Sequence, residues 1–166
     1  MMALDCSSDK LAPICQLDLP SAGPFGTGHG HFGLMTPDRN LWIVRSRSEG
    51  ERTAFYRGTL SAWNPDTKQN IWSLEMSALS PLWRQISSIS IHPNGKLLAA
   101  GVVEREAVVG KFHRLASHVL LINISDGKPL GYFKAHRNTC AAYFSSDGER
   151  ILTVSGGECA MNLWAV

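Results

Sequence analysis

Two histidines near the start of the chain, His29 and His31, have the spacing of two ligands for one metal ion. Alternate residues of an extended strand lie on the same face, so both imidazoles could reach the same ion. A zinc site needs three or four protein ligands, however, and the neighbouring sequence offers no third. We therefore expect no metal here and interpret His31 as a strand residue beside His29.

The sequence lacks the motifs of familiar catalytic sites. It contains no GxSxG, no HExxH and no closely spaced pair of nucleophile and base. Its glycine-rich run, GPFGTGHG, does not stand between a strand and a helix as phosphate-binding loops do. The four cysteines lack the paired spacing of a zinc site and are too few for a disulfide scaffold. We expect neither an enzyme nor a bound cofactor.

Basic residues gather in two segments that could contact an acidic peptide or another anion. The first segment contains Arg45, Arg47, Arg52 and Arg57, and the second contains Arg105, Lys111, Phe112, His113 and Arg114. The net charge of the whole chain is only +2, and its other cations are scattered, unlike those of typical nucleic-acid binders. We predict that both segments are loops that bind other proteins or peptides. Nucleic acid or another anionic surface is the alternative partner, and a merely solvated loop is the simplest interpretation.

The overall composition is that of a single globular domain. The chain has 166 residues, of which 44% are hydrophobic and 18% are charged, a balance that disordered chains do not have. It has no apolar run long enough to cross a bilayer, and its N-terminus lacks the basic and apolar parts of a signal peptide. We expect no membrane association and a cytoplasmic location, with the nucleus as the alternative compartment.

Three segments of the sequence resemble one another: HGHFGLMTPDRNLWIV, ISSISIHPNGKLLAAG and CAAYFSSDGERILTVS. In each, an apolar run meets a short polar turn, and a second apolar run follows. Asn-Gly and Asp-Gly between apolar runs are strong signals for a β-hairpin, because both residues tolerate the positive φ of tight turns. A third apolar run follows each hairpin, and a fourth follows the first two. The repeated unit is therefore four short antiparallel strands.

Repetition of this unit predicts an all-β fold made of propeller blades, in preference to a single sandwich or barrel. We divide the chain into an N-terminal segment, residues 1–20, and a run of blades, residues 21–166. The blades comprise about residues 28–76, 86–134 and 136–166. The repeat is about 53 to 56 residues long, and its excess over typical repeats lies in the two basic segments, between the second and third strands.

The last repeat closely resembles a WD repeat. That family has a Gly-His pair before the first strand, an SPDG-like turn after it and a Trp-Asp pair at the end of the third strand. Here these places hold Ala135-His136, Ser146-Asp147-Gly148 and Trp164-Ala165. The resemblance implies a buried hydrogen-bond network of His136, Trp164 and an acidic residue, with Glu158 in the place of the usual Asp. A longer carboxylate need not reach the same imidazole nitrogen, and an unpaired buried polar group costs about 1–3 kcal/mol.

The two earlier repeats match the family less closely. Trp63-Asn64 and Ile122-Asn123 stand in the place of Trp-Asp, and Gly28-His29 is the candidate Gly-His pair of the first repeat. WD-repeat proteins mostly serve as platforms on which other proteins assemble, so the resemblance implies a protein-binding scaffold. An enzyme with a site in the central channel is the alternative that this kind of fold allows.

Three blades are too few to close a propeller ring, which needs about four to eight. We therefore expect an incomplete ring: a fragment of a larger propeller, a chain that pairs with a second copy into a six-bladed ring, or an open, curved array of three sheets. The last repeat also stops at its third strand. In WD propellers the N-terminus typically supplies the missing strand, and residues 14–19 alternate suitably for pairing beside Trp164.

The apolar runs also predict which residues of the last two repeats are buried. Packing between sheets should bury Ala142, Phe144, Ile151, Leu163 and Trp164. The turns must meet water, which should expose Asn94, Asp126 and Asp147. We expect no helix longer than two turns in residues 86–166.

Overall fold

The computed structural model describes residues 2–5, 12–16, 32–48, 57–108 and 111–166. Nearly all of the regular structure in this part of the chain is β-strand, and its one helix, α1 (Met76–Leu79), is a single turn. The prediction of an all-β fold without a long helix is confirmed. No helix in these residues is long and apolar enough to cross a membrane.

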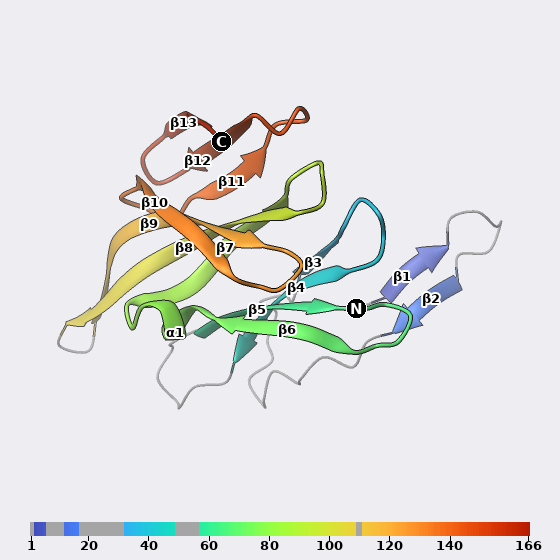
Figure 1. Ribbon diagram of the computed structural model, residues 1–166. Helices are drawn as coiled ribbons and strands as arrows, with labels where there is room; N and C mark the ends of the chain where they lie inside the picture. Colours follow the sequence, from blue (N-terminus) through green and yellow to red (C-terminus); the bar gives the residue numbers. More distant parts are fainter. Residues whose placement is uncertain (1, 6–11, 17–31, 49–56, 109–110) are drawn as a thin grey trace.

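The strands after residue 31 form three antiparallel sheets in series, each a simple meander (Figure 1). The first sheet contains β3 (Phe32–Met35), β4 (Trp42–Ser48), β5 (Arg57–Trp63) and β6 (Asn70–Glu75). The middle sheet contains β7 (Trp83–Ile91), β8 (Leu97–Val108), β9 (Lys111–Asn123) and β10 (Pro129–His136). The last sheet contains β11 (Ala141–Phe144), β12 (Arg150–Ser155) and β13 (Ala160–Ala165). The division at residue 20 and the limits given above for the three blades stay predictions.

The N-terminal strands form a small sheet of their own. β1 (Met2–Asp5) pairs antiparallel with β2 (Ala12–Gln16). The strand predicted at residues 14–19 is therefore present in part, but its partner is β1 and not β13, and residues 17–19 lie outside the described residues. Within the described part of the chain, β13 has a neighbouring strand on one side only.

Equivalent tight turns join the first two strands of each sheet. Each turn closes with a backbone hydrogen bond from Arg39, Gly95 or Gly148 to the carbonyl three residues earlier, at 2.8, 2.8 and 3.0 Å. The donating residue has a positive φ in all three, 62° for Arg39, 74° for Gly95 and 79° for Gly148. Glycine adopts this conformation without steric cost, which is why Asn-Gly and Asp-Gly predicted two of these hairpins.

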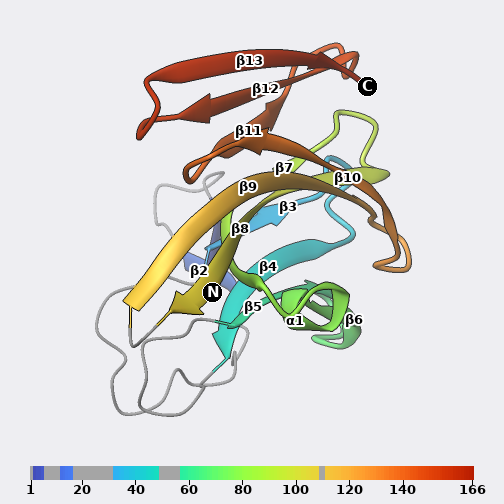
Figure 2. The ribbon, with the colours of Figure 1, turned by 90° about the vertical axis from the view of Figure 1, so that its left-hand side faces the viewer.

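The three sheets stack as layers, with the middle sheet between the other two (Figure 2). One apolar core lies between the first and middle sheets and includes Ile43, Leu60, Trp72, Ile86, Leu98 and Ile122. A second core lies between the middle and last sheets and includes Ala99, Val119, Cys140, Ala142 and Ile151. Because neighbouring residues of a strand face opposite sides, β8 contributes Leu98 to one core and Ala99 to the other.

Hydrogen bonds also tie the layers together. The indole N–H of Trp72, in the first sheet, donates to the carbonyl of Ile124 in the middle sheet at 2.7 Å. Backbone N–H groups of β11 donate to serine hydroxyls of β7: Ala142 to Ser88 at 2.9 Å and Phe144 to Ser90 at 3.1 Å. These contacts satisfy polar groups that would otherwise be left unpaired between packed sheets.

The predicted burial pattern is correct for the turns and for part of the last repeat. Asn94, Asp126 and Asp147 are exposed. Ala142 and Ile151 are buried, whereas Phe144 and Trp164 are half-buried and Leu163 is exposed. The prediction for Leu163 was wrong because this side chain lies on the face of β13 that is turned away from the middle sheet.

Candidate functional site

The second basic segment is a β-hairpin and not the predicted loop. β8 and β9 continue through it in regular antiparallel register, from the pair of Arg105 and Arg114 to the pair of Val108 and Lys111. β7 begins opposite Glu104 and β10 ends opposite Ser117, so beyond these points the two strands pair only with each other. We call residues 105–108 and 111–114 the hairpin arm. Its strands project beyond the rest of the middle sheet (Figure 2).

The first basic segment is only partly described, and what is described is strand. Arg45 and Arg47 belong to β4, and Arg57 begins β5, where it pairs with Ser48. Arg52 lies outside the described residues. The structure therefore corrects the loop prediction at three of the four arginines, because these strands too are longer than the repeat pattern suggested.

Polar contacts fix the base of the hairpin arm. The backbone N–H of Arg105 donates to the carbonyl of Leu82 at 2.9 Å, and its guanidinium donates to the side-chain oxygen of Gln85 at 2.6 Å. The imidazole Nε2 of His118 lies 2.9 Å from the carboxylate of Glu104. The Nδ1 of His118 is buried without a hydrogen-bond partner in the described residues, so the contact of Nε2 with Glu104 is what holds the imidazole in place.

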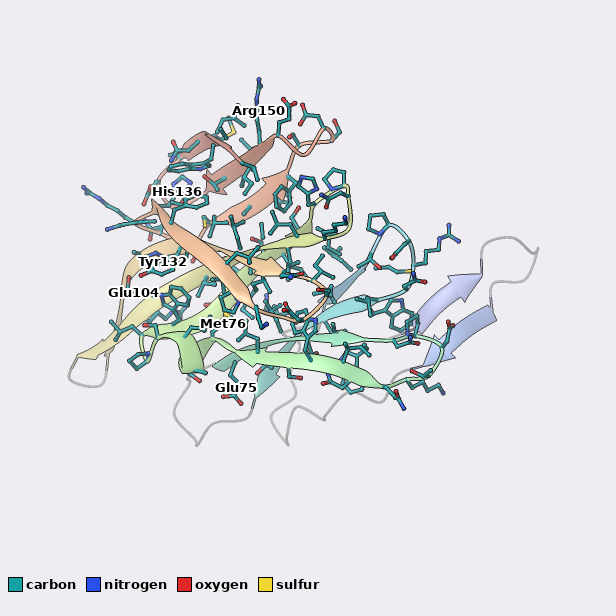
Figure 3. All side chains as sticks on the ribbon, in the orientation of Figure 1. Glu75, Met76, Glu104, Tyr132, His136 and Arg150 are labelled. Atoms are coloured by element: carbon teal, nitrogen blue, oxygen red, sulfur yellow. The ribbon has the colours of Figure 1, made fainter. Side chains whose placement is uncertain are left out.

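Two aromatic rings, those of Trp83 and Tyr132, pack beside this pair. Trp83 is only 5% exposed and meets Tyr132 edge to face, with ring centroids 5.0 Å apart. The ring of His118 lies 5.6 Å from Trp83 and 5.7 Å from Tyr132. Tyr132 is 64% exposed, and it lies on the same side of the molecule as Glu104 (Figure 3). The base of the arm therefore combines a packed aromatic support with an exposed tyrosine, a residue type enriched in protein interfaces.

The motif residues of the last repeat form a hydrogen-bond chain that joins His136, at the end of β10, to the last sheet. The indole N–H of Trp164 donates to the hydroxyl of Thr153 at 2.9 Å, and that hydroxyl lies 3.0 Å from Nε2 of His136. Nδ1 of His136 lies 3.2 Å from the carboxylate of Glu158. The longer carboxylate does reach the imidazole, because it stands in a turn that brings it back over His136.

Glu158 is also held by the backbone. Its carboxylate accepts the N–H of Asn138 at 2.8 Å and the N–H of Arg137. Desolvation raises the pKa of Glu158, but the hydrogen bonds from His136 and these two N–H groups outweigh it, and the pKa lies below its usual value. The ionised carboxylate therefore stabilises the turn between β12 and β13.

The other motif residues have local structural roles. Asp147 accepts the N–H of Glu149 at 2.9 Å within the turn, and the carbonyl of Gly148 lies 3.1 Å from Nε2 of His92 in the middle sheet. Trp63 donates to the hydroxyl of Ser61, on its own strand, at 2.9 Å. His29 lies outside the described residues. Among the residues that are described, no group of three His, Cys, Asp or Glu could hold a metal ion.

Sequence reasoning missed four residues of these two sites. Thr153, which links Trp164 to His136, was not predicted, although it is a lone hydroxyl in the apolar run ILTV. Trp83, Glu104 and Tyr132 were not predicted either. Nothing in their spacing signals that the strand pairing brings them together around His118.

Comparison with known proteins identifies the fold. No family model matches the sequence, and no curated protein matches it. The chain is similar to the crystal structure of the RRP9 WD40 repeats, with a TM-score of 0.57 and 15% sequence identity, over 84% of this chain and 37% of that one. It also matches Sqt1 of Chaetomium thermophilum bound to the N-terminus of the ribosomal protein L10, with a TM-score of 0.40 and 14% identity, over 80% of this chain and 44% of that one. The first similarity shows that the sheets have the fold of WD40 propeller blades, as the resemblance implied.

Proposed function

We propose that this chain is a protein-binding module, in which WD40-type blades hold the hairpin arm as the element that contacts a partner. The observation that carries the proposal is the extension of β8 and β9 beyond β7 and β10. A two-stranded ribbon that extends beyond its sheet is a suitable element for contacting a partner, because the sheet behind it fixes its direction.

The chemistry of the arm favours an acidic or mixed polar partner surface. It carries Arg105, Lys111 and Arg114 in eight described residues, together with Phe112 and His113. Guanidinium groups bind carboxylates in two parallel hydrogen bonds, and Arg and aromatic residues dominate the energy of many interfaces. The exposed ring of Tyr132 near the base would extend the same contact surface.

A charge-reversal experiment tests the proposal. The arm variant is Lys111→Glu with Arg114→Glu. The control is Lys96→Glu with Lys128→Glu, which makes the same charge change at exposed turns at the opposite ends of β8 and β9. Proteins captured from nuclease-treated extract by the unmodified chain would be purified, and their affinity for each variant measured by calorimetry.

We expect the arm variant to weaken binding at least tenfold and the control to change it less than about twofold. Equal loss in both variants would mean that overall charge, and not the arm, determines binding. Retention of binding by the arm variant, or capture that depends entirely on nucleic acid and falls steeply with salt, would overturn the proposal.

A further inference from the structure

The carboxylate of Glu104, at the base of the hairpin arm, has one oxygen that is held and one that is open. Its Oε2 lies 2.9 Å from Nε2 of His118, and this is the only ion pair that Glu104 makes among the described residues. The other oxygen accepts no hydrogen bond from these residues and is not buried, since the side chain of Glu104 is 22% exposed. The carboxylate can therefore accept a further donor from outside the chain.

An exposed aromatic ring lies beside this carboxylate. Tyr132 stands opposite Leu120 and therefore on the same face of the middle sheet as His118, two residues earlier on β9. The imidazole of His118 contacts both the carboxylate of Glu104 and the ring of Tyr132 (Figure 3). Because the buried ring of Trp83 also packs against Tyr132, the tyrosine is supported from behind while most of its own surface stays exposed.

The neighbouring cations of the chain do not occupy the open oxygen. Lys134 stands opposite His118 on β10 and is exposed, but within the described part of the chain it forms no ion pair with Glu104. Arg105 follows Glu104 in the sequence, and its guanidinium donates to Gln85 on β7. The position beside Glu104 and Tyr132 is therefore available to a cation from another molecule.

A partner that covers the base of the hairpin arm would take water away from Glu104. Removing a carboxylate from water is strongly unfavourable unless a donor replaces the lost hydration, so such a partner must bring a donor to the open oxygen. Arginine suits the position best, because its planar guanidinium donates several hydrogen bonds and also stacks on aromatic rings. Its aliphatic stem can pack along Tyr132 at the same time.

We propose that Glu104 and Tyr132 bind an arginine side chain of the partner, with the guanidinium at the open oxygen of Glu104. The inference rests on the proposed function, because it places this arginine in the protein that contacts the hairpin arm. The partner surface then has two parts, an acidic part opposite the arm and a basic residue at its base. Charges of opposite sign at the two ends fix the direction in which the partner lies along the arm.

A short blocked glycine peptide with one central arginine is the probe. The same peptide with citrulline, which has nearly the same shape and no charge, is its control. Binding to the intact chain is followed by NMR at constant ionic strength through the indole N–H of Trp83, assigned with Trp83→Phe. We expect the arginine peptide to bind with a Kd in the millimolar range, and the citrulline peptide to bind about fivefold more weakly or less.

Two variants remove the two halves of the site. Glu104→Gln keeps an acceptor for His118 but removes the charge, and it should weaken the arginine peptide about fivefold or more; Tyr132→Leu should weaken it about threefold. The controls are Glu149→Gln, at the exposed turn between β11 and β12, and Tyr143→Leu, at a tyrosine that is 50% exposed on the last sheet. Each control should change the affinity less than about twofold. Circular dichroism checks that all four variants are folded.

Equal binding of the two peptides would overturn the inference, as would an unchanged affinity in Glu104→Gln or an equal loss in Glu149→Gln. The arm variant, Lys111→Glu with Arg114→Glu, should bind the arginine peptide undiminished, because neither residue belongs to this site.

The captured partner separates this inference from the proposed function. We expect its affinity to fall about fivefold or more in Glu104→Gln as well as in the arm variant. A loss in the arm variant alone would support the proposed function and overturn the arginine site. A loss in Glu104→Gln alone would support the arginine site and overturn the arm as the element that contacts the partner.

Discussion

The last two repeats have the same strand arrangement but different residue types at equivalent positions. By sequence spacing, Trp83 corresponds to His136, which ends β10 and begins the last repeat, and Ala100 of the middle sheet corresponds to Thr153 of the last sheet. Ile122 of the middle sheet pairs across to β8 as Trp164 pairs across to β12. The last sheet joins its residues by hydrogen bonds, whereas the middle sheet packs apolar side chains there.

This difference shows that the blade does not depend on the polar network. A buried polar group needs a partner, so the hydrogen-bond chain must be complete or absent. The middle sheet lacks every residue of this hydrogen-bond chain. It has no hydroxyl at Ala100, and it has no indole N–H at Ile122 that would need one. Its own polar pair, Glu104 and His118, lies elsewhere, at the base of the hairpin arm.

The largest expected effect is in the middle sheet, where apolar side chains stand at the positions that the hydrogen-bond chain occupies in the last repeat. Trp83→Ala would remove a buried side chain from the core between the first and middle sheets and should destabilise the chain by about 3–5 kcal/mol. Urea unfolding followed by circular dichroism measures this change. Tyr132→Ala removes the exposed partner of the same ring pair and should cost clearly less. Equal losses would show that Trp83 acts through the surface cluster and not through the core.

A smaller effect on stability is expected when the hydrogen-bond chain of the last repeat is interrupted. Thr153→Val keeps the shape of the side chain but leaves the indole N–H of Trp164 and Nε2 of His136 without their shared partner. It should destabilise the chain by about 1–3 kcal/mol, the cost of unpaired buried polar groups. The matched control is Thr153→Ser, which keeps the hydroxyl. If valine were as stable as threonine in urea unfolding, the hydrogen-bond chain would contribute nothing beyond packing.

The contrast between the sheets also explains what the sequence could reveal. His136, Glu158 and Trp164 were predicted because a polar network requires particular residue types in a known order. Trp83 and Ala100 carry no such mark, since many apolar residues can fill a core. The hairpin turns were predictable for a related reason: Gly95 and Gly148 adopt positive φ, which few other residues do.

Two features could not be predicted because they depend on how far a strand continues and on what covers it. The second basic segment contains no proline, so a strand could run through it, but its length beyond the usual repeat favoured a loop. Leu163 follows the alternation of a buried strand residue, yet it is exposed because no described element packs on that side of β13. The alternation of apolar residues shows which face of a strand is apolar, but it does not show whether another element packs on that face.

The smallest expected effect is the part of the pH dependence of stability that comes from Glu158 and its hydrogen bonds. In the folded chain the pKa of Glu158 lies below its usual value of 4.5, so the unfolded chain binds this proton more readily. The stabilisation is therefore present above about pH 4.5 and is lost as the pH falls through the pKa of the folded state. Unfolding free energies measured from about pH 6 to pH 3 should fall more steeply for the unmodified chain than for Glu158→Gln, which has no carboxylate to protonate.

Comparison of the two chains cancels the contribution of Asp38, Asp126 and Asp147, whose pKa values are also lowered by turn hydrogen bonds and which both chains retain. If the unfolding free energies of the two chains fell equally with pH, the contact between Glu158 and His136 would not stabilise the last sheet, and the hydrogen-bond chain would add nothing to the response of the protein to acid.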